Sequence, residues 1–277
     1  MPTDDRSSPS GDGFKSQALH QQQVSPSQIG ESKGTGSRAL VDTDFYAYKA
    51  AAASTFTAKW DEHNRIGMTN LSMAKDKFRG FIEWVEESVP GHTPIFCLGG
   101  RSNFRYGLYP SYKSNRRERL RPWDYVEFMD WIRDTFLTIQ INNVETDDVL
   151  GLSYESGDVI ISGDKDMRTI PGVHLQGEEV IEVSQDEADH NFYCQVLSGD
   201  SCDGYPGCKG TGVVGAAKLL AHCTTNEERW GLVRQAYRKA KHDEYFAITQ
   251  ARLARILRVG EYDYENGEPK LWIPPVA

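Results

Sequence analysis

Residues 158–166 read Asp-Val-Ile-Ile-Ser-Gly-Asp-Lys-Asp, an apolar run of strand length that is followed at once by two acids. The same arrangement occurs at residues 39–42, where Ala-Leu-Val precedes an aspartate. Short apolar runs of this kind predict strands that are buried on both faces of a sheet. Ligands of open α/β sheets bind beyond the carboxyl ends of the strands. The two acidic ends therefore mark the edge of the predicted sheet where function is expected.

Outward from these two runs, short apolar segments alternate with helical spacing until about residue 185, and the pattern is then all helical to about residue 257. Strands are expected at residues 39–42, 94–98, 136–141 and 158–162. Helices are expected at residues 46–58, 70–88, 123–135 and 146–154, with a short helix after Asp164. This alternation predicts the α/β class, with a mostly parallel central sheet flanked by helices.

Length and composition divide the chain into three parts. The 277 residues, 39% of them hydrophobic, suffice for a sizeable core. Residues 1–38 are rich in Ser, Gln, Gly and Pro, a composition that predicts a disordered tail. Residues 39–184 are expected to form the α/β core, and residues 185–277 the helical region.

Nothing in the sequence indicates membrane insertion or secretion. No stretch approaches the roughly 18 apolar residues of a membrane span, and residues 1–38 lack the apolar segment of a signal peptide. The five cysteines are odd in number and irregularly spaced, so no disulfide framework is expected. These features favour the cytoplasm as the compartment.

Charge is sorted along the chain rather than mixed. The net charge is −9, yet residues 101–121 carry seven basic side chains against one acid, and residues 229–258 carry eight against two. Such sorting suggests a polyanion bound next to a cluster of metal-binding carboxylates. The alternative is that the basic side chains of these segments lie on ordinary solvent-exposed faces of helices.

The acids gather in four clusters, each predicted to lie in a turn at a strand end or at a helix start. They are Asp42, the Glu145–Asp147–Asp148 group, Asp164 with Asp166, and Asp200 with Asp203. Hard oxygen ligands select Mg²⁺ or Mn²⁺ rather than Zn²⁺. Two such ions side by side suit phosphodiester cleavage. Helix caps and surface acids are the alternative interpretation.

Two further segments suit a nucleic acid. Residues 204–215 are glycine-rich and contain a literal G-x-G-x-x-G, but a turn precedes the motif where a dinucleotide fold needs a strand. A hairpin between two helices that offers backbone N–H groups to a DNA phosphate fits better than a simple glycine cap. Residues 103–117 interleave basic and aromatic side chains, which suits a single strand; the alternative is a partly buried aromatic loop.

Taken in order, these motifs resemble the flap-endonuclease superfamily of PIN-like 5′ nucleases, and most closely the 5′→3′ exonucleases of short-tailed bacteriophages. The resemblance extends over about residues 39–275. The segments that carry it are Leu40–Asp44, Asn103–Arg105, Tyr109–Arg116, Glu145–Asp148, Gly163–Asp166, Gly199–Gly207, Ala254–Arg258 and Leu271–Trp272.

The resemblance implies a nuclease core with two bound Mg²⁺ ions, for which Mn²⁺ substitutes. It implies a basic arch at about residues 101–135 and a C-terminal helix–three-turn–helix element, which in relatives often holds K⁺. First-site ligands would be Asp42, Glu145, Asp147 and Asp148. Second-site ligands would be Asp164, Asp166, Asp200 and Asp203.

The resemblance also assigns the DNA contacts and the activity. Lys113 and Arg116 would act on the scissile phosphate as catalytic residues. DNA-binding residues would be Arg105, Tyr112, Lys113, Arg116, Arg117, Lys209, Gly210 and Gly212. The implied reaction removes nucleotides from duplex 5′ ends, with flap cleavage and RNA-primer removal, including from RNA–DNA hybrids, in the cytoplasm of a host bacterium.

One departure from the superfamily pattern bears on activity. An Asp usually follows the second strand, but here Gly99 and Gly100 stand in that segment. Asp44 lies two residues after Asp42 and is the nearby acid that could compensate for the missing one. The alternative function is therefore a catalytically weakened protein that binds 5′ DNA ends. A PIN-type ribonuclease is a further alternative, against which the glycine-rich hairpin argues.

Overall fold

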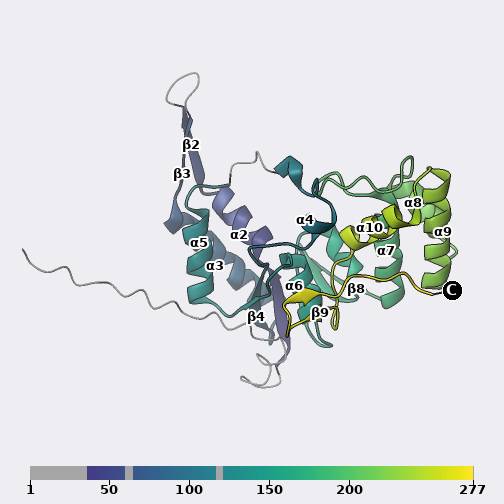
Figure 1. The fold of residues 1–277 in the computed structure, drawn as a ribbon. Helices are drawn as coiled ribbons and strands as arrows, with labels where there is room; N and C mark the ends of the chain where they lie inside the picture. Colours follow the sequence, from purple (N-terminus) through teal and green to yellow (C-terminus); the bar gives the residue numbers. More distant parts are fainter. Residues whose placement is uncertain (1–35, 60–64, 117–120, 277) are drawn as a thin grey trace, which may run out of the picture.

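A six-stranded sheet in the order β5-β4-β1-β6-β7-β8 forms the centre of the computed structural model, which describes residues 36–59, 65–116 and 121–276 (Figure 1). The first five strands in this order are mutually parallel, and β8 runs antiparallel to β7. The strands are β1 (Arg38–Asp42), β4 (Thr93–Leu98), β5 (Thr138–Gln140), β6 (Val159–Ile161), β7 (Gly172–Gln176) and β8 (Glu179–Val183). The predicted α/β class and mostly parallel sheet are confirmed.

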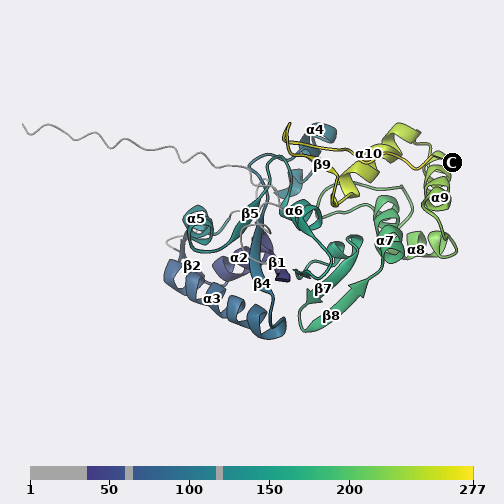
Figure 2. The same ribbon diagram turned by 90° about the horizontal axis from the view of Figure 1, so that it is seen from below.

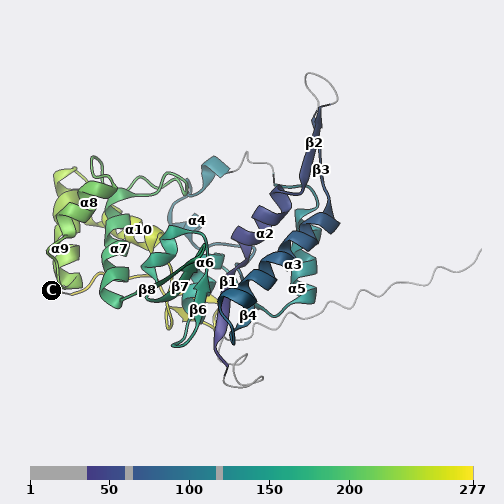
Figure 3. The ribbon, with the colours of Figure 1, turned by 180° about the vertical axis from the view of Figure 1, so that it is seen from behind.

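Helices cover both faces of the sheet because alternate strand residues point to opposite sides. Val41 and Phe96 pack under α2 (Thr43–Ala52), α3 (Leu71–Ser88) and α5 (Tyr125–Thr135). Leu40 and Ile160 pack on the other face against α6 (Thr146–Ser153) and the short helix η2 (Lys165–Thr169). Figures 2 and 3 show α2, α3 and α5 gathered on one side of the sheet.

Four helices build a second core beside the sheet: α7 (Gln185–Ser198), α8 (Val213–Leu220), α9 (Asn226–Lys239) and α10 (Glu244–Ala254). After α10 the chain returns to the sheet through the small hairpin of β9 (Tyr262–Asp263) and β10 (Glu268–Pro269). Trp272 then packs against Phe192 and Trp230 of the helical region. The C-terminal segment thus contacts both cores.

Part of the expected helix at residues 46–58 is wrong. The helix begins earlier, at Thr43, because the Asp42 side chain caps it by accepting a hydrogen bond from Phe45 N. It ends at Ala52, and residues 55–59 form β2 (Thr55–Lys59), which pairs with β3 (Arg65–Thr69) in a hairpin that projects from the molecule (Figure 1). The hydroxyls of Thr55 and Thr69 hydrogen-bond across the pair, and threonine is favoured in strands.

Strands β7 and β8 were not expected from the sequence. Gly177, with φ of 63°, lies in the two-residue turn between them, and His174 is buried in β7. The tail expected at residues 1–38 falls largely outside the described residues, and its last residue, Arg38, begins β1. All five cysteines are free, as expected. In the described part of the chain, none of the helices combines the length and the apolar character that crossing a membrane requires.

Candidate active site

The predicted acidic edge forms at the carboxyl ends of the central strands. Asp42 ends β1, Asp147 lies in the first turn of α6, and Asp164 and Asp166 follow β6. These carboxylates are close enough to repel one another: Asp42 is repelled by Asp164, Asp147 by Asp42, and Asp166 by Asp200. Four segments that are far apart in sequence therefore converge on one acidic edge.

Three carboxylates of this edge have pKa values above the ordinary range. Burial, and then repulsion by Asp44 and Asp164, raises the pKa of Asp42 to about 7, against hydrogen bonds from Ser162 and Phe45. Burial and repulsion raise the pKa of Asp147 as well. Burial and repulsion by Asp164 and Asp200 raise the pKa of Asp166 to about 7.

A donor set of crowded carboxylate oxygens fits a hard divalent cation, because such a cation offsets the repulsion that raises these pKa values. Within residues 36–59, 65–116 and 121–276, no three acidic, histidine or cysteine side chains converge tightly enough to enclose an ion. The acids instead line an open edge. An open edge suits Mg²⁺, which keeps several water ligands and uses one or two carboxylates together with substrate phosphates.

Lys113 joins a second group of acids next to this edge. Its ammonium forms an ion pair with Glu145 and lies 3.5 Å from Asp203 Oδ2. Burial alone would lower the pKa of Lys113, but Glu145 and Asp203 together raise it, so the amine stays charged. Arg116 Nη2 donates to Asp203 Oδ1 at 2.6 Å. Both predicted catalytic cations thus contact predicted metal-site acids.

The backbone of Lys113 is held in an unusual conformation at this place. Its φ is 52°, in the left-handed region that a non-glycine residue rarely occupies. Its N–H donates to the Asp203 carbonyl at 2.7 Å, and Asn115 Nδ2 donates to the carbonyls of Ser201 and Cys202. The loop after α7 therefore holds the segment that carries Lys113 and Arg116.

Tyr112 does not fit the DNA contact that the resemblance implied. Its side chain is 1% exposed, and its hydroxyl lies 2.8 Å from Glu145 Oε2 and 2.7 Å from Asp203 Oδ2. Its ring lies against Tyr205 and Tyr106. The sequence shows an aromatic residue in a basic segment, but only the fold shows that this ring belongs to the protein interior.

Arg105 and Asp148 also need correction. Arg105 is 2% exposed and pairs with Asp148, which is fully buried, so Arg105 cannot reach a phosphate. Both Asp148 oxygens already accept two hydrogen bonds each, which leaves no lone pair for an ion. Neither the predicted DNA contact of Arg105 nor the predicted metal contact of Asp148 fits this geometry.

Asp44 lies next to the acidic edge. The strand ends at Asp42, so Asp44 falls in the first turn of α2. Thr146 Oγ1 donates to Asp44 Oδ2 at 2.7 Å and accepts from Gly99 N at 2.9 Å. This hydrogen-bonded chain links Asp44 to the segment where the superfamily usually has its additional Asp.

Gly99 and Gly100 are explained by close backbone packing. A Cβ on Gly99 would lie 2.9 Å from Thr146 N, and a Cβ on Gly100 would lie 2.7 Å from the Asn142 Cα. Both distances are shorter than the contacts that real Cβ atoms make with backbone atoms. Neither Gly99 nor Gly100 therefore has room for a carboxylate side chain unless the segment at residues 142–146 moves.

The glycine-rich segment is a loop between α7 and α8, as expected. Gly212 is the N-cap of α8, Gly210 has a φ of 86°, and Lys209 is exposed beside them. At the base of the loop, Gly207 N donates to Gln250 Oε1 of α10. Arg117, the remaining predicted DNA contact, lies outside the described residues.

Comparison with known proteins adds to this geometry. No protein-family model matches the sequence. The chain is 27% identical over 278 residues to the exodeoxyribonuclease of Enterobacteria phage T3, covering 85% of this chain and 92% of that protein. The fold matches the 5′-exonuclease of phage T5 with bound zinc at a TM-score of 0.56 and 17% identity, over 79% of this chain and 89% of that one.

A second T5 structure, a flap endonuclease with DNA and metal ions, matches at a TM-score of 0.51 and 14% identity, over 79% of this chain and 88% of that one. The sequence similarity to the T3 exodeoxyribonuclease and the fold shared with the T5 nucleases indicate that the protein is a nuclease. Among nucleases, the chain is similar in sequence and fold to 5′→3′ exonucleases of bacteriophages.

Proposed function

We propose that the protein is a divalent-metal-dependent 5′→3′ exodeoxyribonuclease that acts on the 5′ ends of double-stranded DNA. The observation that carries the proposal is the edge of mutually repelling carboxylates, buried at Asp42 and half-buried elsewhere, next to the charged Lys113 and Arg116. The name of the T3 relative and the zinc and DNA of the T5 structures support it.

The acids of the site fall into two groups, those without a cationic partner and those paired with a lysine or an arginine. Asp42, Asp147, Asp164, Asp166 and Asp200 have no cationic partner among the ion pairs of the described residues, so they are the proposed metal-binding set. When bound, Mg²⁺ supplies an activated water and stabilises charge on the phosphate oxygens. Glu145 is paired with Lys113 and Arg105, and Asp203 with Lys113 and Arg116, so each would join this set only if it releases these cations.

Lys113 and Arg116 have a different proposed role, which is to neutralise the scissile phosphate. The raised pKa of Lys113 means that this amine carries its charge at neutral pH and cannot serve as a general base. The Arg116 side chain is 42% exposed and can turn from Asp203 to a phosphate.

The resemblance extends the proposal to flap cleavage, to RNA primers in RNA–DNA hybrids and to K⁺ at the loop around Gly210.

Digestion of linear duplex DNA tests the proposal. One substrate carries a 5′ label and the other a 3′ label, and each is incubated with Mg²⁺, Mn²⁺ or EDTA. Metal-dependent release of short products from the 5′ label, with gradual shortening of the 3′-labelled strand, is the expected result. Asp166→Asn should abolish release and keep DNA binding, whereas Asp130→Asn, at an exposed acid of α5, should match the wild type.

The absence of a carboxylate at Gly99 and Gly100 favours a second candidate, a protein that binds 5′ ends without cleaving them. No release with either metal, together with a salt-sensitive gel shift on the same DNA, would support this candidate and reject the exonuclease. Release that starts at the 3′ label would reject both.

A further inference from the structure

Arg105 and Asp148 form a buried ion pair, and Arg105 Nη1 also lies 3.5 Å from Glu145 Oε2. Arg105 Nη1 donates to Asp148 Oδ2 at 2.6 Å, and Nη2 donates to Oδ1 at 2.8 Å. This two-pronged geometry is the strong form of an arginine–carboxylate interaction. With Arg105 2% exposed and Asp148 fully buried, neither group can exchange its partner for water.

The pair connects three segments that are distant in sequence. Arg105 begins α4 (Arg105–Leu108) and also donates to the carbonyls of Leu253, at 3.1 Å, and Arg255, at 2.7 Å. Asp148 lies in the first turn of α6 and accepts from Leu257 N at 3.0 Å. The end of α10 is therefore attached to the nuclease core through this pair.

The same pair fixes the backbone that carries the proposed metal-site acids. Asp148 Oδ2 accepts from Glu145 N at 3.0 Å, which closes the capping box of α6. Glu145 and Asp147 stand on this first turn, so its orientation decides where their carboxylates lie. Groups that hold ligand-bearing backbone in this way commonly influence metal affinity without touching the metal.

We propose that Arg105 and Asp148 are positioning residues: together they attach the C-terminal helical region to the first turn of α6 and thereby set the positions of Glu145 and Asp147. The proposal rests on the proposed function, since it treats Asp147 as a metal-binding acid and Glu145 as an acid that joins the set when it releases its cationic partners. It gives the pair no contact with the ion or with DNA.

The chain offers a matched control in a second buried pair, Arg38 with Asp158. Arg38 is 7% exposed and Asp158 is 4% exposed, and the arginine also contacts both carboxylate oxygens. Arg38 begins β1, whereas Asp42 of the acidic edge ends it. Arg38→Lys therefore disturbs an equivalent buried pair at the opposite end of the strand.

The test compares Arg105→Lys and Asp148→Asn with Arg38→Lys. Lysine keeps the charge of Arg105 but cannot contact two carboxylate oxygens and two carbonyls at once. Arg105→Lys and Asp148→Asn should each weaken Mn²⁺ binding, measured by calorimetry without DNA, by about 10- to 100-fold, and Arg38→Lys should not. Asp148→Asn is a second route to the same measurement if Arg105→Lys does not fold.

Two further readouts separate this inference from other roles. Hydrogen exchange at the Glu145 and Leu257 amides should speed up in Arg105→Lys and not in Arg38→Lys, a result that is readable even if the protein has no nuclease activity. The salt dependence of DNA binding should be unchanged in Arg105→Lys, because the guanidinium makes no phosphate contact.

Three outcomes would overturn the inference. A reduced salt slope in Arg105→Lys would make Arg105 a DNA contact. Loss of Mn²⁺ binding in Asp148→Asn but not in Arg105→Lys would make Asp148 a metal ligand. Equal effects of Arg105→Lys and Arg38→Lys on Mn²⁺ binding would show that the Arg105–Asp148 pair stabilises the fold in general and does not position the metal-site acids.

Discussion

Individual carboxylates at the acidic edge determine how the protein responds to pH. Asp166 titrates near 7 in the folded protein, whereas the same group titrates near 3.8 when it is free of this environment. Between these two values the folded protein binds the proton more tightly than the unfolded chain does. Stability contributed by this group is therefore present below about pH 4 and is lost as the pH rises toward 7.

Asp166→Asn should remove this pH dependence because an amide does not titrate. In EDTA, the variant should melt at a higher temperature than the wild type at pH 8, and the gain should shrink by pH 5. Thermal melts of both proteins at several pH values provide the measurement. A gain in melting temperature that does not change with pH would show that the carboxyl group is not perturbed in the way described.

Packing at Gly100 makes a second prediction at the scale of one residue. Gly100→Asp introduces the acid that the superfamily usually has, but its Cβ would overlap the backbone at Asn142 and Asn143. Urea denaturation should show a loss of about 1–3 kcal/mol in the free energy of unfolding. Gly80→Asp, at an open position in α3, is the control and should change stability by about 0.5 kcal/mol or less. A stable and more active Gly100→Asp protein would contradict the packing argument.

At the scale of elements, the loop between α7 and α8 depends on two backbones in direct contact. A Cβ on Gly207 would overlap the backbone of Gly199, and Gly207 also has a φ of 63°. Gly210 has a φ of 86° but faces open space. The two glycines thus share a backbone conformation and differ in the room around them.

Alanine at each position separates these two causes. Gly210→Ala should cost about 1–2 kcal/mol, the price of a left-handed conformation alone. Gly207→Ala should cost more, because strain and overlap both act, and it should weaken DNA binding if the loop contacts phosphates. Unfolding curves and gel shifts of both variants provide the comparison. Equal losses in the free energy of unfolding would mean that the close packing of Gly199 against Gly207 does not contribute to stability.

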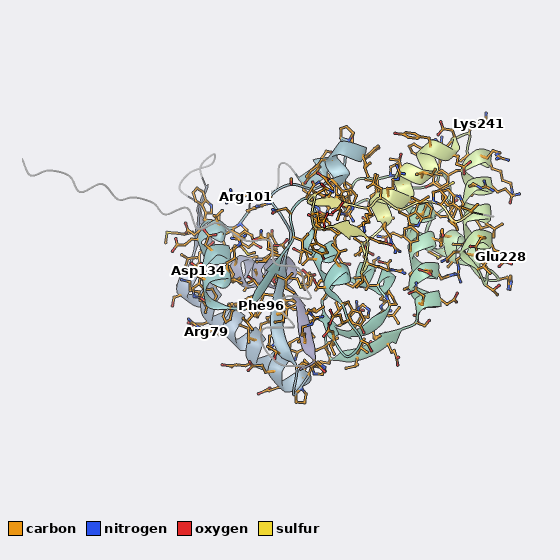
Figure 4. All side chains as sticks on the ribbon, turned by 60° about the horizontal axis from the view of Figure 1, so that its bottom comes forward. Arg79, Phe96, Arg101, Asp134, Glu228 and Lys241 are labelled. Carbon is orange, nitrogen blue, oxygen red and sulfur yellow. The ribbon has the colours of Figure 1, made fainter. Side chains whose placement is uncertain are left out.

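At the scale of the whole molecule, the net negative charge of the protein opposes the binding of DNA, which is also negatively charged. The net charge is −9, but basic residues are concentrated in segments, and Figure 4 shows Lys241 at the outer part of the helical region, well away from Phe96 in the core. Association driven by such local patches releases counterions from DNA and weakens steeply with salt.

Lys209→Gln should therefore lower DNA affinity and reduce the slope of log affinity against log salt by about 0.9, the value of one phosphate contact. Lys77→Gln, at an exposed lysine of α3 outside the helical region, is the control and should leave the slope unchanged. Gel shifts from low to moderate salt measure both slopes. An unchanged slope in Lys209→Gln would exclude the loop from the DNA interface.

Much of the site could be predicted because its signals are local. The apolar runs before Asp42 and Asp164 predict strands, and parallel strands bring their carboxyl ends to one edge. The hairpin at β2 and β3 could not be predicted so directly, because the alanine-rich segment before it favours continued helix. Its strands depend on pairing between Thr55 and Thr69, which are fourteen positions apart.

The α/β class, the acidic edge and the order of the motifs follow from local sequence alone, since each of these depends on neighbouring residues and a fixed side-chain period. Which charged and aromatic residues are buried, among them Arg105, Tyr112 and Asp148, follows from tertiary packing. Arg105 and Asp148 are 43 positions apart, and Asp148 and Leu257 are 109 apart. Burial at these places arises from contacts between distant segments, and such contacts leave no local pattern in the sequence.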